Sequence, residues 1–341
     1  MMPTESSQKS IILDVQGLTK HFPIRSSFWQ KVTGWVRAVN GVDFRIAAGR
    51  TLGLVGESGC GKSTVARMIL KLLEPDSGKI VYRDQDISRV SGKEMKPFRR
   101  KIQIVFQDPY GSLNPRMTIG QSVEEGLRIL GVPRGRQRRD RLEELLNMVG
   151  LSADSADRYP HEFSGGQRQR VGIARALSVN PSLVICDEPI SALDVSIQAQ
   201  IINLLNDLQQ RLELSYLFIS HDLNVVGYLC NDVAVMYNGY IMEYAATETL
   251  FESPVHPYTQ SLLAAVPEPD PDLRKKEIPI RDTEVLKPPP EGCVFSDRCP
   301  LGDAECRRRS LELRQMGPNH WVRCWKAGTK GPAQFTPDAR T

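Results

Sequence analysis

The chain has 341 residues and a formal net charge of +4, with 40% of its residues hydrophobic and 25% charged. This composition is typical of a globular protein and excludes the fibrous and intrinsically disordered classes. So small a net charge gives no reason to expect a nucleic-acid partner. The length predicts one full-sized domain with a smaller region beside it.

Neither a secretory signal nor a membrane-spanning segment is expected. Residues 1–10 are polar, whereas a signal peptide has an apolar core. No uninterrupted apolar run approaches the ~20 residues that span a bilayer. We therefore expect a cytoplasmic chain that reaches a membrane only through other proteins. Its seven cysteines then favour metal binding or burial over disulfide pairing.

Between residues 11 and 252, short β-branched runs alternate with helical patterns, which predicts an α/β domain around a mostly parallel sheet. The expected strands are residues 11–15, 51–55, 103–106, 183–186, 216–219 and 233–236. The expected helices are residues 63–73, 141–149, 167–179, 197–212 and 223–229, the last beginning after Asp222, a capping residue type. The segment 118–175 is almost entirely helical in pattern, which indicates a helical subdomain inserted in the sheet domain.

Two segments do not follow this alternation. Residues 26–37 hold Phe28, Trp29 and Trp35 in a polar stretch, and we expect a loop that covers its own domain or contacts a membrane subunit. From residue 266 onward, prolines cluster and four cysteines follow. This change predicts a main domain over residues 11–265 and a linker with a small Cys-rich region over residues 266–341.

The segment from Gly56 to Thr64 reads Gly-Glu-Ser-Gly-Cys-Gly-Lys-Ser-Thr and lies between an expected strand and an expected helix. This is the pattern and the context of a phosphate-binding loop. Its glycines let backbone N–H groups approach phosphate oxygens, and the helix N-terminus adds a favourable dipole. Lys62 is expected to reach the β- and γ-phosphates of ATP, and Ser63 to bind Mg²⁺. The expected ATP-binding residues of the loop are Gly56, Glu57, Ser58, Gly59, Cys60, Gly61, Lys62, Ser63 and Thr64.

A second polar site follows the apolar run 183–186, which ends in Asp187 and Glu188. In parallel sheets, ligands bind beyond the carboxyl ends of the strands. Asp187 therefore suits the Mg²⁺ shell, and Glu188 suits the polarisation of an attacking water. Two acids alone could simply begin a turn, but the phosphate loop gives them a function.

Four further elements make the family recognisable. Gln107 follows an apolar run, Phe163-Ser-Gly-Gly-Gln begins a helix, Ser191-Ala-Leu-Asp follows the acid pair, and Ser220-His-Asp ends the next strand. In this order, over about residues 11–265, the chain resembles the nucleotide-binding subunit of an ATP-binding cassette (ABC) transporter. The resemblance implies a phosphate-loop NTPase core of α/β class. Phe163 replaces the commoner Leu of the signature and keeps the position apolar.

In this family two such domains face head to tail, and the signature of one closes over the ATP of the other. The residues that the resemblance assigns to that contact are Ser164, Gly165, Gly166, Gln167 and Asp194. A helix that begins with a serine and two glycines also offers exposed N–H groups, so it is an anion site without a lysine of its own.

The resemblance also assigns roles to single residues. Gln107 would sense Mg²⁺ and the attacking water, and would couple the site to the membrane subunit. His221 would contact the γ-phosphate and help to fix the water. Phe22 matches an aromatic residue that stacks on adenine. The expected catalytic residues are thus Glu188, His221 and Gln107, and the expected Mg²⁺ ligands are Ser63, Gln107 and Asp187.

Further segments resemble the subfamily that imports oligopeptides, dipeptides and, in some members, nickel. They are residues 107–115, 237–243, 254–263 and 292–300. This resemblance implies a second, related but non-identical ATPase subunit, two permease subunits and a substrate-binding protein, at the cytoplasmic face of a prokaryotic membrane.

The cysteines of the C-terminal region are Cys293, Cys299, Cys306 and Cys324. Four thiolates admit either zinc or an iron–sulfur cluster. A tight Cys-x-x-Cys pair, usual in zinc knuckles, is absent here, and members of the resembled subfamily can hold a [4Fe-4S] cluster. We therefore expect such a cluster, with zinc or unliganded cysteines as alternatives, and expect His320 to take no part in it.

Two other functions stay open. One is a soluble ABC ATPase of translation or DNA repair, although those usually carry two cassettes or a long coiled-coil insertion. The other is a nucleotide-sensing module without turnover, against which the intact Glu188 and His221 argue. The transported solute cannot be named, because other subunits select it.

Overall fold

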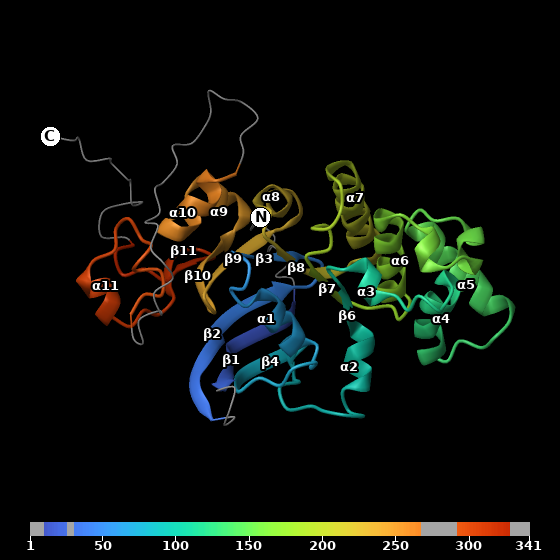
Figure 1. Ribbon diagram of the computed structural model, residues 1–341, viewed down its shortest axis with the longest axis horizontal. Helices are drawn as coiled ribbons and strands as arrows, with labels where there is room; N and C mark the ends of the chain where they lie inside the picture. The colour runs from blue at the N-terminus through green and yellow to red at the C-terminus, as the bar shows by residue number, and fades with distance from the viewer. Residues whose placement is uncertain (1–9, 26–30, 267–291, 328–341) are drawn as a thin grey trace, which may run out of the picture.

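The structure, a computed structural model, describes residues 10–25, 31–266 and 292–327. It contains an eight-stranded sheet in the order β11-β12-β10-β9-β3-β8-β7-β6 and a four-stranded sheet in the order β2-β1-β4-β5. Figure 1 shows the smaller sheet below the larger one, a helical lobe at one end and the C-terminal region at the other.

Five neighbouring strands of the large sheet run parallel. They are β9 (Asp232–Tyr237), β3 (Thr51–Val55), β8 (Ser215–Ser220), β7 (Leu183–Asp187) and β6 (Ile102–Val105). Successive side chains of a strand point to opposite faces. Leu183 and Ile185 accordingly join the core on one face, and Val184 and Cys186 the core on the other. Burial on both faces explains the continuous apolar run, and the expected parallel α/β core is confirmed.

The small sheet is antiparallel. Its strands are β1 (Ile11–Arg25), β2 (Val32–Ala47), β4 (Ser77–Tyr82) and β5 (Gln85–Asp86). The loop expected over residues 26–37 is therefore wrong for residues 32–37, which form the start of β2 and pair with β1. Trp35 is 59% exposed there, whereas Phe28 and Trp29 lie outside the described residues.

Helices cover both faces of the large sheet (Figure 1). On one face α1 (Lys62–Ile69) buries Val65, Met68 and Ile69 in a core shared with the small sheet. The other face is covered by α7 (Val195–Leu212), α8 (Leu223–Leu229), α9 (Thr247–Glu252) and α10 (Pro257–Ala264). Two short helices flank β6, namely α2 (Lys96–Lys101) and α3 (Pro109–Ser112). The described residues contain no helix with both the length and the apolar character needed to cross a bilayer.

A helical lobe is inserted between β6 and β7 (Figure 1). It consists of α4 (Ile119–Ile129), α5 (Arg136–Met148), the 3₁₀ turns η1 (Ala153–Asp157) and η2 (Pro160–Glu162), and α6 (Gly165–Leu177). The Arg168 guanidinium of α6 lies 3.5 Å from the centre of the Tyr110 ring of α3. This cation–π contact joins the lobe to the segment that follows β6.

The C-terminal region extends the large sheet. Its hairpin, β11 (Arg314–Gly317) and β12 (His320–Val322), pairs through β12 with β10 (Tyr240–Ala246), and α11 (Ala304–Arg308) precedes it. Glu243 of β10 is completely buried, and one of its carboxylate oxygens lies 2.8 Å from His320 Nε2. His320 thus fastens the hairpin to the sheet. The expected linker, residues 267–291, lies outside the described residues.

Candidate nucleotide-binding site

The segment between β3 and α1 turns sharply, which requires glycine. Gly56 and Gly61 have φ angles of 149° and 113°. A Cβ at Gly56 would lie 2.0 Å from the carbonyl oxygen of Met236, and one at Gly61 would lie 2.1 Å from that of Ala38. Any larger residue at these two positions would collide with backbone, so the turn depends on glycine.

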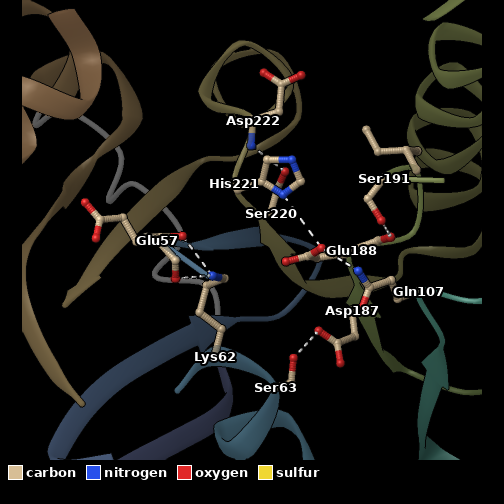
Figure 2. A network of polar contacts seen from close by, with 12 residues as sticks. Glu57, Lys62, Ser63, Gln107, Asp187, Glu188, Ser191, Ser220, His221 and Asp222 are labelled. Atoms are coloured by element: carbon tan, nitrogen blue, oxygen red, sulfur yellow. Dashed lines mark hydrogen bonds and ion pairs between the residues drawn. The ribbon is translucent and has the colours of Figure 1, made fainter. Parts of the chain in front are cut away.

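Lys62 is the first residue of α1 and is only 4% exposed. Its ammonium donates hydrogen bonds to the carbonyl oxygens of Gly56 at 2.8 Å and Glu57 at 3.0 Å. The charge therefore lies inside the curve of the loop, beside these carbonyl oxygens (Figure 2), and Lys62 is itself the first residue of the helix. A lysine and a helix N-terminus together form an anion site.

Ser63 and Asp187 meet across the gap between α1 and the end of β7. The Ser63 hydroxyl donates to Asp187 Oδ1 at 3.0 Å. Burial raises the pKa of the Asp187 carboxyl, and the hydrogen bond from Ser63 opposes that shift. A hydroxyl and a carboxylate beside a phosphate site are the oxygen ligands that Mg²⁺ prefers, so these two residues fit that ion.

Glu188 is held in a backbone conformation that L-residues rarely adopt, with φ 48°. Its N–H donates to the carbonyl oxygen of Ile219 at 3.0 Å, and the Ser191 hydroxyl donates to its carbonyl oxygen at 3.1 Å. These two hydrogen bonds, one to β8 and one from Ser191, hold Glu188 in its strained conformation.

The Glu188 carboxylate meets two other expected site residues. The Gln107 amide donates to its Oε2 at 2.8 Å, and His221 Nδ1 lies 3.6 Å from the same oxygen. Gln107 follows β6 and His221 follows β8, so the ends of three parallel strands bring the three side chains together (Figure 2). The arrangement can hold and polarise a water molecule next to an anion site.

The Ser-Gly-Gly-Gln segment lies elsewhere, at the start of α6 in the helical lobe (Figure 1). Ser164 and Gln167 form a reciprocal cap: the Gln167 N–H donates to the Ser164 hydroxyl at 3.3 Å, and the Ser164 N–H donates to Gln167 Oε1 at 3.0 Å. Gly166 packs closely, since a Cβ there would lie 2.4 Å from Ile197 Cγ2. This second helix N-terminus is thus separate from the first.

Two other residues that were expected to contact ATP, Asp194 and Phe22, lie in more exposed positions. Asp194 is the N-cap residue of α7, without a hydrogen bond from its side chain to the helix. Phe22 lies on β1 and is 37% exposed, with the Lys20 ammonium 5.8 Å from the centre of its ring. Its exposed ring can accept a flat apolar partner such as a base.

Two residues near the phosphate loop were not expected from the sequence. The Glu57 N–H donates to the Tyr258 hydroxyl at 3.1 Å. Arg298, from the C-terminal region, binds both carboxylate oxygens of Glu57. The sequence offered no local signal for either contact, because 201 and 241 residues separate the partners.

The four C-terminal cysteines line one cavity of about 20 Å³. Burial raises the pKa of the Cys293 and Cys299 thiols to about 12. Among residues 10–25, 31–266 and 292–327, no group of three or more His, Cys, Asp or Glu side chains is arranged to hold a metal ion. The sulfur donors suit zinc or iron, but their positions do not form a closed ligand set. The other cysteines, Cys60, Cys186 and Cys230, are buried.

A strand, a glycine loop and a helix, with acids after a neighbouring strand, define the class of phosphate-loop ATPases. The ABC transporter family pattern matches residues 39–191, and the pattern for the C-terminal region of oligopeptide/dipeptide transporters matches residues 242–306. The oligopeptide transport ATP-binding protein AppF of Bacillus subtilis is 48% identical over 94% of this chain and 98% of its own length. A putative peptide import ATP-binding protein of Brucella ovis is 49% identical over 92% of this chain and 97% of its own.

Solved structures agree with this assignment. The cassette MJ0796, dimeric and bound to ADP and Pi, has a TM-score of 0.60 and 29% identity and covers 69% of this chain and 98% of its own. The protein cbiO1 of Clostridium perfringens, from the transporter complex cbiONQ, has a TM-score of 0.62 and 29% identity, over 71% of this chain and 91% of its own. The chain belongs to the family of ATP-binding subunits of ABC transporters, and it is an ATPase.

Proposed function

We propose that this ATPase powers the import of di- or oligopeptides across the cytoplasmic membrane of a prokaryote. The observation that carries the proposal is the near-full-length similarity to peptide import subunits, at 48–49% identity over 92–94% of the chain. The match of residues 242–306 to a region of oligopeptide/dipeptide transporters supports the same solute class.

The subunit would work in a larger assembly. Its partners would be a second, non-identical ATPase subunit arranged head to tail with it, two permease subunits at whose cytoplasmic face it is peripheral, and a substrate-binding protein that delivers the solute. Two separate helix N-termini in one chain, at Lys62 and at Ser164, support this arrangement, because each can serve one half of a shared nucleotide site.

In the proposed site, the loop residues 56–64 hold the phosphates of ATP, with the Lys62 ammonium on the β- and γ-phosphates. Phe22 stacks on adenine. The start of α6, residues 164–167, and Asp194 contact the ATP that the partner cassette holds. Phe163, the residue before Ser164, is only 4% exposed and packs in the hydrophobic core. This packing fixes the start of α6.

Hydrolysis would depend on the residues around Glu188. Its carboxylate orients the water and accepts its proton as the water attacks the γ-phosphorus and the bond to the β–γ bridging oxygen breaks, so that ADP and phosphate are released. Gln107 and His221 keep the carboxylate and the water in place. Ser63, Asp187 and Gln107 would hold Mg²⁺, which neutralises charge on the phosphates when bound. The hydrogen bond between Ser63 and Asp187 supports this assignment.

Reconstitution in proteoliposomes tests the function. The chain would be purified with the permease and ATPase subunits encoded beside it, and uptake of labelled di- and oligopeptides would be measured with the binding protein and ATP present. ATP-dependent uptake that Glu188→Gln abolishes is expected. ATP turnover without uptake of any peptide would favour a soluble or non-peptide ATPase, and binding without turnover would favour a nucleotide sensor.

For the C-terminal region, we propose a [4Fe-4S] cluster on Cys293, Cys299, Cys306 and Cys324, with a structural role. The support is that all four line one cavity, although bringing the sulfurs to a cluster requires local rearrangement. Anaerobic purification followed by metal analysis and visible absorbance tests it. Four irons per chain with a broad brown absorbance are expected, whereas one zinc without colour, or no metal, would refute the cluster.

A further inference from the structure

The phosphate loop contains an acidic residue, Glu57, directly after its first glycine. A carboxylate next to a triphosphate site is unfavourable, because like charges repel at short range. The Glu57 side chain is 40% exposed and its carboxylate points away from Lys62 (Figure 2), so water screens part of this repulsion, but the charge still belongs to a loop residue.

Arg298 meets this carboxylate with both of its terminal nitrogens. Nη1 lies 2.8 Å from Glu57 Oε2, and Nη2 lies 3.0 Å from Oε1. Parallel bonds of this kind fix the orientation of both groups, which a single contact does not. Nη1 also lies 3.3 Å from the Tyr237 hydroxyl, so the guanidinium is itself held from β9.

Aromatic packing anchors the segment that carries Arg298. The Phe295 ring is completely buried, with its centre 5.2 Å from that of Tyr237 and 5.3 Å from that of Tyr258. The Tyr258 hydroxyl accepts a hydrogen bond from the Glu57 N–H. The C-terminal region therefore supports both the side chain and, through Tyr258, the backbone of Glu57.

We propose that Arg298 is a positioning residue for ATP binding: it neutralises Glu57 and fixes the phosphate loop, so that the C-terminal region sets the ATP affinity of the cassette. The inference rests on the nucleotide site proposed above. It does not require the cluster, but Arg298 is the residue before Cys299, so the cysteine region is directly linked in sequence to a residue that contacts the loop.

A charge-coupling experiment tests the inference. Arg298→Met keeps the length and packing of the side chain but leaves Glu57 unpaired in the loop. We expect ATP binding to the full-length chain to weaken about tenfold, because the unpaired carboxylate repels the phosphates and the loop loses its paired bonds. In the assembled complex the KM for ATP should rise while kcat changes little. Glu57→Gln alone should tighten ATP binding, and Arg298→Met/Glu57→Gln should bind ATP more tightly than Arg298→Met.

Arg307→Met is the matched control. Arg307 belongs to the same region and forms an ion pair with Asp297 at 2.7 Å, without contact to the loop, so this variant should bind ATP as the unaltered chain does. If Arg298→Met does not fold, Arg298→Lys replaces it, since a lysine keeps the charge but loses the paired bonds, and intermediate affinity is expected.

Two results would overturn the inference. The first is an unchanged ATP affinity of Arg298→Met, or of Arg298→Lys if Arg298→Met does not fold. The second is a double variant that binds ATP no more tightly than Arg298→Met. Failure of the unaltered chain to bind ATP would instead refute the nucleotide site itself.

Discussion

The chain carries two helix N-termini suited to phosphate, and they are connected to the rest of the molecule in different ways. Around the phosphate loop, side chains from α1 and from the ends of β6, β7 and β8 reach one another through hydrogen bonds. At the start of α6, Ser164 and Gln167 bond to each other instead. In the function proposed above, the residues around the phosphate loop carry out the chemistry, whereas the capped start of α6 contacts a nucleotide held by another chain. A site shared between two cassettes needs this division.

The largest effect is expected where the catalytic contacts meet. Glu188→Gln removes the charge that is proposed to polarise water but keeps the shape of the side chain, so turnover by the assembled complex should fall by about 10²- to 10⁴-fold. ATP binding, measured by equilibrium titration, should persist because the loop is untouched. Near-normal hydrolysis by this variant would remove Glu188 from the catalytic role.

A smaller but still clear loss of turnover is expected from a substitution at the start of α6. Ser164→Arg places a long side chain over the capped helix end, so turnover at the opposite site should drop at least about tenfold through lost bonds to charged phosphate. ATP binding to this chain's own loop should be retained.

The control for that variant is Thr118→Arg. Thr118 forms the same reciprocal cap with Gln121 at the start of α4, so both variants should lose about 1 kcal/mol of stability from the lost cap. If Thr118→Arg lowers turnover as much as Ser164→Arg does, the effect of Ser164→Arg comes from lost stability. The start of α6 would then have no special part in turnover.

The third prediction concerns how closely α6 packs against α7. Gly166→Ala forces a Cβ to within 2.4 Å of Ile197 Cγ2, and such overpacking costs about 1–3 kcal/mol. Gly172→Ala, later in α6, meets nothing within 4 Å and should stabilise the helix by up to about 1 kcal/mol. Thermal unfolding should therefore shift in opposite directions for the two variants, and equal shifts would argue against close packing of α6 on α7.

Local signals explain which parts of this fold the sequence predicts. The expected strand 51–55 coincides with β3, and Asp222 caps the helix 223–229 as expected, its side chain accepting from the Asn224 N–H. In both cases the deciding pattern lies within a few residues. The same holds for the meeting of Gln107, Glu188 and His221, because the carboxyl ends of parallel strands lie at one edge of a sheet.

The missed features depend on distant partners. Only residues 11–15 were expected as a strand, but β1 continues to Arg25 because it pairs with β2 as far as that residue. The pairing of β12 with β10 crosses about 80 residues, and nothing in the sequence around Arg298 indicates Glu57. Such contacts are set by how separate segments pack, which local periodicity does not encode.

The most direct test of a site shared by two cassettes compares ATP turnover per chain in the isolated full-length protein and in the assembled transporter. The arrangement of the two helix ends predicts turnover on the order of 10²-fold faster in the assembly, because the preorganised donors that stabilise the transition state then come from both chains. An equal rate per chain in the two samples would show that the phosphate loop and Glu188 suffice alone, and would contradict the shared site.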